Sequence, residues 1–471
     1  MGAGAEVFGG RMPSGEGDLG VETHGISPIP AGNRFGRPWR LFGVWFAPNL
    51  TMAAIFTGTL GAVLGLDFRT GLAAIAVGTL IGALPVAYLS TWGPRTGSAQ
   101  LPVARLPFAR GVVLPGAVQW LSTIMWDALT ALFGGDALAE LSGMPFWLSV
   151  GIVLVLQCLL GVFGYAVIHR VQTVVTAVGV VGFALFAIKA VPGHPLPAGG
   201  ELHGGALAGA VVLFTTISLS LAVSWVPYAS DYSRYLPAGT PPRSVFWFTG
   251  TAIVLSCTLS QGLGLALADT LGGTTAAGVR GLVGGGAAGV VALLVILVVT
   301  VSANAMNDYS GSLALQTVGI RLRRPVSAVI ATVVAYALTL WMHSGDLSAK
   351  FENVLLFVGY WVPPFLGVVL PDWVARRRGA AAAARSWPAL LAFLAGFAAA
   401  VPFTNTSLYT GPVAAALDGA DLAYYVGFLV SAAVYLVVRR FAGQAPSSSP
   451  AGDEDHRRLP LRPGTPPTSP S

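Results

Sequence analysis

The side chains best suited to chemistry in this sequence lie inside long apolar stretches. Asp127 falls near the centre of the stretch 112–135. The same helical face carries, at i, i+4, i+7 and i+11 spacing, Thr123, Asp127, Thr130 and Gly134. Because an ionised carboxylate at membrane depth is costly, we expect Asp127 to face an aqueous cavity, to have a partner or to be protonated. A role in proton coupling or substrate binding competes with a structural, hydrogen-bonded aspartate.

A second polar group closes the stretch 284–307. Asn304 and Asp308 share a face at i, i+4, and Ser302 lies on the turn before them. Hydroxyl and carbonyl oxygens suit a hard cation. The alternative is that residues 307–312 are simply the inner end of a helix that meets water.

Prolines interrupt two stretches beside polar and aromatic residues. Pro48 precedes Asn49, and Pro227 follows Ser224 and Trp225. Each proline removes an amide donor and clashes with the preceding turn, so each predicts a kink. The pair Pro363-Pro364 predicts a third bend, which is either a gate or a static kink. Irregular backbone at membrane depth persists only where it is buried or lines a cavity.

The elements that must position these residues are twelve apolar stretches. A hydrocarbon core about 30 Å thick requires roughly 20 apolar residues in a helix. Hydrophobic residues make up 54% of the chain and charged residues 10%, which excludes a soluble domain of 471 residues. The predicted spans are 41–65, 70–93, 112–135, 146–168, 171–188, 208–231, 245–268, 284–307, 325–342, 353–371, 387–407 and 422–438.

The two interrupted spans are five apart in chain order. Because five is odd, a second set of five helices begins on the opposite side of the membrane, which is the arithmetic of an inverted repeat with the substrate between the interruptions. We therefore predict an all-α membrane protein with twelve transmembrane helices in a five-plus-five inverted repeat (LeuT-type). The first repeat covers about 41–188, the second about 208–371, and two extra helices about 387–438.

Basic residues predict the orientation of the 41–440 membrane domain. One side collects Arg34, Arg37, Arg40, Arg95, Arg105, Arg110, Arg170, Arg234, Arg243, Arg321, Arg323, Arg324, Arg376, Arg377, Arg378, Arg385, Arg439 and Arg440. The other side has Arg69, Lys189, Arg280 and Lys350. Basic loops stay cytoplasmic, so both termini of this multi-pass plasma-membrane protein are expected there. The net charge of +6 thus reflects topology, and no nucleic-acid partner is expected.

The two tails carry no predicted fold. Residues 1–40 are rich in Gly and Pro without an apolar core, which predicts a cytoplasmic tail and no cleavable signal peptide. Residues 441–471 are rich in Ser and Pro with mixed charge, which predicts a disordered cytoplasmic tail.

The cysteines and histidines argue against metal or hydrolytic chemistry. Cys158 and Cys257 lie inside predicted spans without metal-ligand spacing, and we interpret them as packing residues. The six histidines lie in tails, loops or span ends, and no DxxxD or HxxxH pair falls in a span. An intramembrane enzyme acting on lipid substrates is therefore only a distant alternative.

Several short segments, placed in order on the spans, resemble the nucleobase–cation symporters of the purine and cytosine permease type, whose relatives include hydantoin and allantoin permeases. The resemblance runs from about Glu22 to Arg440. The matching segments are Glu22–Pro30 before the first span, Gly93–Gly97 and Arg105–Phe108 after the second, Asp231–Pro237 after the sixth and Tyr309–Leu315 after the eighth.

The resemblance implies the inverted-repeat fold with two added helices, and a substrate site. In that site a planar heterocycle stacks between Trp126 and Trp225, and stacking is worth about 1–3 kcal/mol per base. The edge-binding positions fall at Thr130, at Ser224, and at Asn304 or Asp308. The hydantoin-type member has a glutamine where this chain has Thr130, which weakens the case for hydantoin-like specificity.

The resemblance also implies a cation site. Sodium-coupled members use backbone carbonyls, here those of Ala47 and Leu50, and a Ser-Thr hydroxyl pair that aligns with Ser302 and Ala303. One hydroxyl is thus missing, which should weaken a sodium site. With Asp127 available, Na⁺ and H⁺ both remain open as the co-transported ion.

The sequence therefore predicts a secondary active transporter, not an enzyme, that imports a nucleobase, with cytosine or a purine first. The alternatives are allantoin, hydantoin, uracil-like or pyrimidine vitamin-precursor substrates. The expected partners are a small heterocyclic substrate and the lipid bilayer, with no cofactor and no obligate protein partner evident.

Overall fold

The computed structural model describes residues 25–162, 165–200, 202–270, 276–320, 324–379 and 385–442. Within these residues the fold is helical, and the extended pairing is limited to a single bridge between Asn405 and Thr410. The predictions for 1–24 and 443–471 in the two tails lie outside the described residues.

Each of the twelve predicted stretches contains a helix. The main helices are α1 (Arg40–Phe46), α2 (Met52–Val63), α3 (Phe68–Ser90), α6 (Val113–Ser142), α7 (Phe146–Val162), α8 (Tyr165–Ala190), α9 (Gly204–Val223), α10 (Pro242–Ala266), α12 (Gly286–Val318), α13 (Arg324–His343), α14 (Leu347–Tyr360), α15 (Val362–Arg377), α16 (Trp387–Ala400) and α18 (Ala423–Ala442). Short helices join them: α4 (Trp92–Thr96), α5 (Gln100–Phe108), α11 (Ala276–Leu282) and α17 (Pro412–Ala416).

Fewer helices than the predicted twelve are long and apolar enough to cross a membrane, when judged by length and composition alone. Among the described residues, eight helices qualify, and a ninth span is formed by the pair 40–49 and 52–63, which is bent by 56°. Three shorter apolar helices cover Phe146–Leu160, Ala177–Ala190 and Trp387–Phe403. The count of twelve spans therefore stays a prediction, whereas an all-helical membrane protein is confirmed.

The helix contacts repeat with an offset of five predicted spans. α2 of the first span packs on α10 of the seventh, and α9 of the sixth packs on α3 of the second. In the same way the α7–α12 contact is matched by α13–α6, and the α8–α12 contact by α14–α6. The helices α6 and α12 pack on each other at the centre of this pattern. This is the contact pattern that an inverted repeat requires.

Glycines allow the closest of these contacts, between α2 and α10. A Cβ on Gly58 would lie 1.9 Å from the carbonyl oxygen of Gln261, and a Cβ on Gly264 would lie 1.8 Å from that of Ile55. Small residues let helix backbones approach within membranes, where van der Waals packing drives association. The two glycines thus fix the distance between the broken first span and its neighbour.

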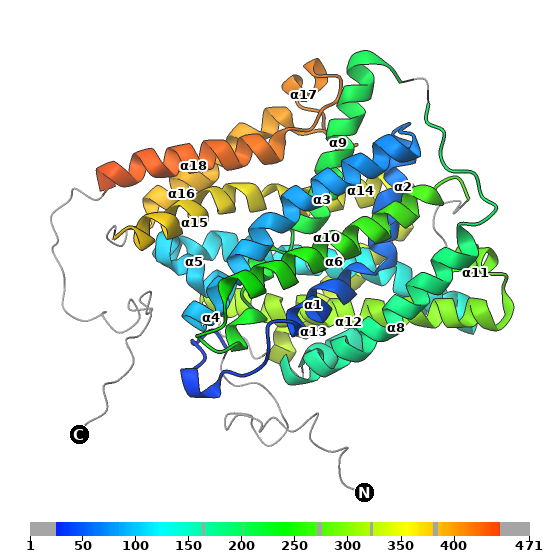
Figure 1. Ribbon diagram of the computed structural model, residues 1–471, viewed down its shortest axis with the longest axis horizontal. Helices are drawn as coiled ribbons and strands as arrows, with labels where there is room; N and C mark the ends of the chain where they lie inside the picture. The colour runs from blue at the N-terminus through cyan, green and yellow to red at the C-terminus, as the bar shows by residue number, and fades with distance from the viewer. Residues whose placement is uncertain are drawn as a thin grey trace, which may run out of the picture.

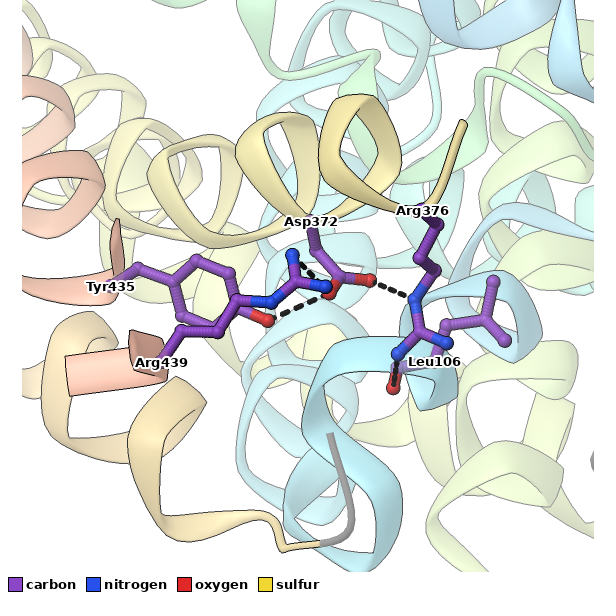
Figure 2. A network of polar contacts seen from close by, with 5 residues as sticks. All are labelled: Leu106, Asp372, Arg376, Tyr435 and Arg439. Atoms are coloured by element: carbon purple, nitrogen blue, oxygen red, sulfur yellow. Dashed lines mark hydrogen bonds and ion pairs between the residues drawn. The ribbon is translucent and has the colours of Figure 1, made fainter. Parts of the chain in front are cut away.

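The last helices form a separate layer at one edge of the bundle (Figure 1). There α16 and α18 pack on each other and on α15. Figure 2 shows a buried ion-pair network that ties this layer to the bundle. Asp372 of α15 accepts from Tyr435 at 2.8 Å, pairs with Arg439 at 3.3 Å and also pairs with Arg376, which in turn donates to the Leu106 carbonyl of α5 at 2.7 Å.

The segment before α1 lies against the ends of several helices. Ile29 N donates to the carbonyl of Gly97 at 2.8 Å, and Phe35 N donates to that of Tyr235 at 2.6 Å. The guanidinium of Arg234, which is fully buried, donates to the Gly25 carbonyl at 2.8 Å. Residues 25–35, which we call the N-terminal strap, are therefore held by side-chain and backbone hydrogen bonds to the loops that follow α3 and α9.

Candidate substrate site

The first span is interrupted at the predicted proline. Pro48 lies in a 3₁₀ turn, Ala47–Asn49, between α1 and α2. Because a proline has no N–H, the turn leaves a carbonyl of α1 to be satisfied otherwise. The side chain of Asn49 donates to the Trp45 carbonyl at 2.7 Å. Thr51 then caps α2 by accepting from Ala54 N at 3.3 Å. Side-chain hydrogen bonds therefore satisfy backbone groups on both sides of the break.

The sixth span is interrupted in a similar way. α9 ends at Val223, and Pro227 lies in a 3₁₀ turn, Val226–Tyr228. The Ser224 hydroxyl donates to the Leu221 carbonyl at 2.8 Å, which ties the last turn together. Beyond it the chain continues in short turns instead of a regular helix. Both interruptions predicted from proline positions are therefore present.

The polar face predicted on 112–135 packs against α12. Thr130 of α6 donates to Asn304, and Asn307 donates to Asp127 at 3.1 Å. Further along the same face the contacts are between Thr123 and Gly311, and between Gly134 and Thr300. Residue numbers rise on one helix as they fall on the other, so the two helices are antiparallel.

A cavity opens where the two interruptions face this helix pair. Its volume, counted as the space open to the centre of a water molecule, is about 20 Å³. The lining comes from the first span, α6, the sixth span and α12: Pro48, Asn49, Thr51, Trp126, Thr130, Leu221, Ser224, Trp225, Tyr228, Ala303 and Asn307. Four of the predicted substrate residues, Trp126, Thr130, Ser224 and Trp225, thus lie around one space.

Trp225 is held in a defined orientation. Its indole N–H donates to the Asn49 side-chain oxygen at 2.9 Å. Its ring packs edge-on against Trp45, with centroids 5.7 Å apart, and against Tyr228, with centroids 5.1 Å apart. Asn49 therefore connects the break in the first span with an aromatic wall of the cavity.

Buried hydrogen bonds continue from the cavity wall into the protein. Tyr228 donates to Asn307 at 3.0 Å, and Asn307 donates to Asp127. Asn304 donates to the backbone carbonyl of Asp127 at 3.2 Å and to the side chain of Gln157 on α7. The two amides fix α12 against α6 because each bonds to groups of that helix.

The remaining predicted residues lie around the cavity without lining it. Asn304 lies behind Thr130, fully buried, and Asp308 lies one turn further along α12. Ser302 is buried on α12. The 3₁₀ turn that carries Ala47 packs on α12, where Leu50 and Val299 both lie against Gly179 of α8. The helices expected to form the cation site therefore meet.

Seven of the lining residues were missed as site residues from the sequence, among them Asn49, Tyr228 and Asn307. Tyr228 and Asn307 stand within segments that the sequence marks as polar, and Asn49 stands beside the predicted break. The sequence did carry a signal for Asn307. It follows Asn304 by three positions and Ala303 by four, and residues at these spacings lie on the same side of a helix. Which of these adjacent faces of α12 meets the cavity depends on the rotation of the helix.

The sequence and structure comparisons agree on one family. Residues 28–427 match the family model described as permease for cytosine/purines, uracil, thiamine, allantoin. The chain is 28% identical to the putative purine-cytosine permease YxlA of Bacillus subtilis, covering 89% of this chain and 96% of that protein. It is 26% identical to the purine-cytosine permease fcyB of Emericella nidulans, covering 90% and 89%. It is also 26% identical to a vitamin B6 transporter of Saccharomyces cerevisiae, covering 76% and 66%.

Solved structures share the fold at low identity. Mhp1, a nucleobase-cation-symport-1 family transporter in a closed conformation with bromovinylhydantoin bound, superposes with a TM-score of 0.72 at 17% identity, covering 90% of this chain and 96% of that chain. A Na⁺-coupled sialic acid symporter in a substrate-bound outward-open state gives 0.61 at 12% identity, covering 90% and 93%.

The matched family is one of permeases, so the protein is a transporter and not an enzyme. The chain belongs to the family of permeases for cytosine/purines, uracil, thiamine and allantoin. The predicted resemblance is thereby confirmed.

Proposed function

We propose that the protein is a secondary active transporter that imports a nucleobase or related nitrogen heterocycle, cytosine or a purine first, together with Na⁺ or H⁺. It lies in the plasma membrane with both termini in the cytoplasm. The two repeats alternate in opening the central cavity to each side of the membrane. Coupling then arises because each ligand favours one conformation over the other.

The observation that carries this proposal is the cavity shared by Trp126 and Trp225. Two indoles from different repeats line this cavity, and stacking of a flat, polar ring on an aromatic side chain is worth about 1–3 kcal/mol. Two of the relatives, the putative purine-cytosine permease of Bacillus subtilis and the purine-cytosine permease of Emericella nidulans, support the same substrate class.

The edge of the ring meets hydroxyls and amides. The Ser224 hydroxyl donates its proton to the Leu221 carbonyl, and the single proton of the Thr130 hydroxyl is shared between the Asn304 side-chain oxygen and the Trp126 carbonyl at 2.8 Å. Each hydroxyl oxygen can therefore accept from an N–H group of a substrate. Asn304 reaches the substrate through the Thr130 hydroxyl that it accepts from, and Asp308 belongs to the same helix face. Thr130, Ser224 and Asn304 remain our proposed edge-binding set, whereas Asp308, predicted as a further member, does not line the cavity and is not counted in it.

The co-transported ion has two proposed sites. Na⁺ would use the carbonyls of Ala47 and Leu50 with the Ser302 hydroxyl, where the 3₁₀ turn of the first span packs on α12. H⁺ would use Asp127, which is fully buried beside the cavity-lining Asn307. The proposed Na⁺ site thus lies at the contact of the first span with α12, and the proposed H⁺ site at the α6–α12 contact.

A second substrate class is supported by one relative, the yeast vitamin B6 transporter. Vitamin precursors built on a nitrogen-containing aromatic ring would stack in the same way. They differ from nucleobases in their edge groups, so a ligand panel separates the two classes.

The test is a thermal-shift panel of nucleobases, allantoin and vitamin precursors on the purified protein. A ligand that binds the folded state raises its melting temperature with concentration. We expect cytosine or a purine to do so, and Trp126→Ala and Trp225→Ala to abolish the shift. The matched control is Trp247→Ala, because this indole is 63% exposed and away from the cavity lining. A shift that survives in both cavity variants would refute the stacking site.

A further inference from the structure

The side chain of Asp308 is enclosed without a hydrogen-bond partner. It is 7% exposed, and neither carboxylate oxygen bonds to any group in the described part of the chain. It lies one helical turn beyond Asn304, whose side-chain amide donates to Asp127 of α6 and Gln157 of α7. A carboxylate in such a place costs several kcal/mol if it is ionised.

A second carboxylate lies close to it. Asp127 is fully buried, one of its oxygens accepts from Asn307, and the other has no partner among the described residues. Asn307, which donates to Asp127, directly precedes Asp308 on α12, so both carboxylates belong to the same α6–α12 contact. Two negative charges facing each other away from water repel strongly.

The surroundings supply no compensating positive charge. The titratable groups near enough to interact electrostatically with Asp308 are Asp127 on α6, Cys158 on α7 and Tyr228 on the broken sixth span. α13, which also packs here, contributes Thr339, whose hydroxyl donates to the Ala128 carbonyl of α6 at 3.3 Å. No described Lys, Arg or His forms an ion pair with either carboxylate. The pair therefore needs a ligand of positive charge to be stable.

A proton satisfies this pair better than a metal ion. A hard cation takes about six oxygen ligands, and among the described residues no third carboxylate joins Asp308 and Asp127 to make a metal-holding group. A proton needs a single carboxylate oxygen. We propose that Asp308 and Asp127 form the coupling site of the transporter, and that Asp308 binds the transported proton. This inference rests on the function proposed above and selects H⁺ as its ion.

The pair is placed to link proton binding with substrate binding. Asn304 and Asn307 lie within one turn of Asp308, and they hold Thr130 and Tyr228 at the cavity wall. A proton from solution adds to the Asp308 carboxylate and makes it a neutral acid, which allows α12 to pack closely on α6. When the opposite side opens to water, the acid loses the same proton there. One positive charge thus crosses with each substrate.

The first experiment uses the full-length protein in liposomes with radiolabelled cytosine and adenine. Asp308→Asn mimics the neutral acid, so we expect substrate exchange without a gradient to persist, and accumulation driven by an imposed pH gradient to fall at least tenfold. Asp308→Glu should restore part of that accumulation. The matched control is Asp421→Asn, since Asp421 is equally buried but accepts from Asn405 N and Ala423 N. Unchanged pH-driven accumulation in Asp308→Asn would overturn the proposal.

A second experiment needs no substrate. Infrared spectra of the protein in lipid should show, near neutral pH, the carbonyl band of a protonated carboxylic acid without hydrogen bonds, and Asp308→Asn should remove it. If the band is absent from the unmodified protein, the proposal fails. If cytosine and adenine neither bind nor exchange but the band is present and removed, the substrate class is wrong and the proton site stands.

Discussion

At the scale of single residues, Asn49 connects the break in the first span with the aromatic wall of the cavity and with α10. One carboxamide satisfies the Trp45 carbonyl freed by the break in the first span and accepts the indole N–H of Trp225. The same residue's backbone carbonyl accepts from Ser260 of α10 at 2.8 Å. The position of the Trp225 ring therefore depends on the break in the first span, because Asn49 bonds to both.

We expect Asn49→Ala to weaken substrate binding by roughly tenfold, because a buried donor left without its partner costs about 1–3 kcal/mol. Calorimetric titration of the panel's best ligand measures the change. In a Trp225→Phe background, which has no indole N–H, Asn49→Ala should add little. Asn353→Ala, which removes a half-buried carboxamide away from the cavity, is the control. An equal loss in both backgrounds would show that Asn49 does not act through Trp225.

Residue-level prediction succeeded where a face of the helix was marked by its own polar pattern. Thr130 and Asp127 were expected on one face of α6, and that face packs on α12. On α12 the polar residues Asn304, Asn307 and Asp308 lie on adjacent faces. The N-terminal part of the helix is apolar on every side. Nothing local sets its rotation, so tertiary packing decides that Asn307 and not Asn304 lines the cavity.

At the scale of elements, the close contact of α2 with α10 depends on Gly58 and Gly264. We expect Gly264→Ala to lower the melting temperature strongly or to prevent folding, because its Cβ would collide with the backbone of Ile55, which cannot move aside as a side chain can. Gly281→Ala in α11 is the control, since nothing lies within 4 Å of its Cβ position. Equal melting temperatures for the two variants would contradict this account.

The elements themselves could be predicted because apolar length and proline position are local signals. All twelve stretches contain helix, and both expected interruptions occur. The short helices α4, α5, α11 and α17 were not predicted, since they are set by contacts between loops and spans. Arg376, for example, holds the last turn of α5 through the Leu106 carbonyl.

At the scale of the whole molecule, the Asp372 network joins the outer layer of α16 and α18 to the bundle (Figure 2). The Asp372 side chain is 1% exposed, and those of Arg376 and Arg439 are 8% and 14% exposed. Breaking a buried ion pair by removing one partner costs about 3–5 kcal/mol, because the other charge stays behind. The network should therefore matter more for stability than any exposed pair.

We expect Asp372→Asn to lower the melting temperature in detergent by several degrees. Glu140→Gln is the comparison, because its ion pair with Arg280 at 2.9 Å has side chains 30% and 40% exposed and should contribute about 0–1 kcal/mol. Substrate affinity should change little in either variant, since neither residue lines the cavity. A smaller effect of Asp372→Asn than of Glu140→Gln would show that the outer layer does not depend on this network.

The N-terminal strap has a consequence for the speed of the transport cycle. Ile29, Phe35 and Arg234 bind the strap to loops from both halves of the protein. If those loops separate whenever this face admits water, the strap must detach and dock again in every turnover. Shortening the strap or weakening its hydrogen bonds would then change the rate of substrate transport. The accumulation of substrate at equilibrium would stay the same, because it depends only on the ion gradient.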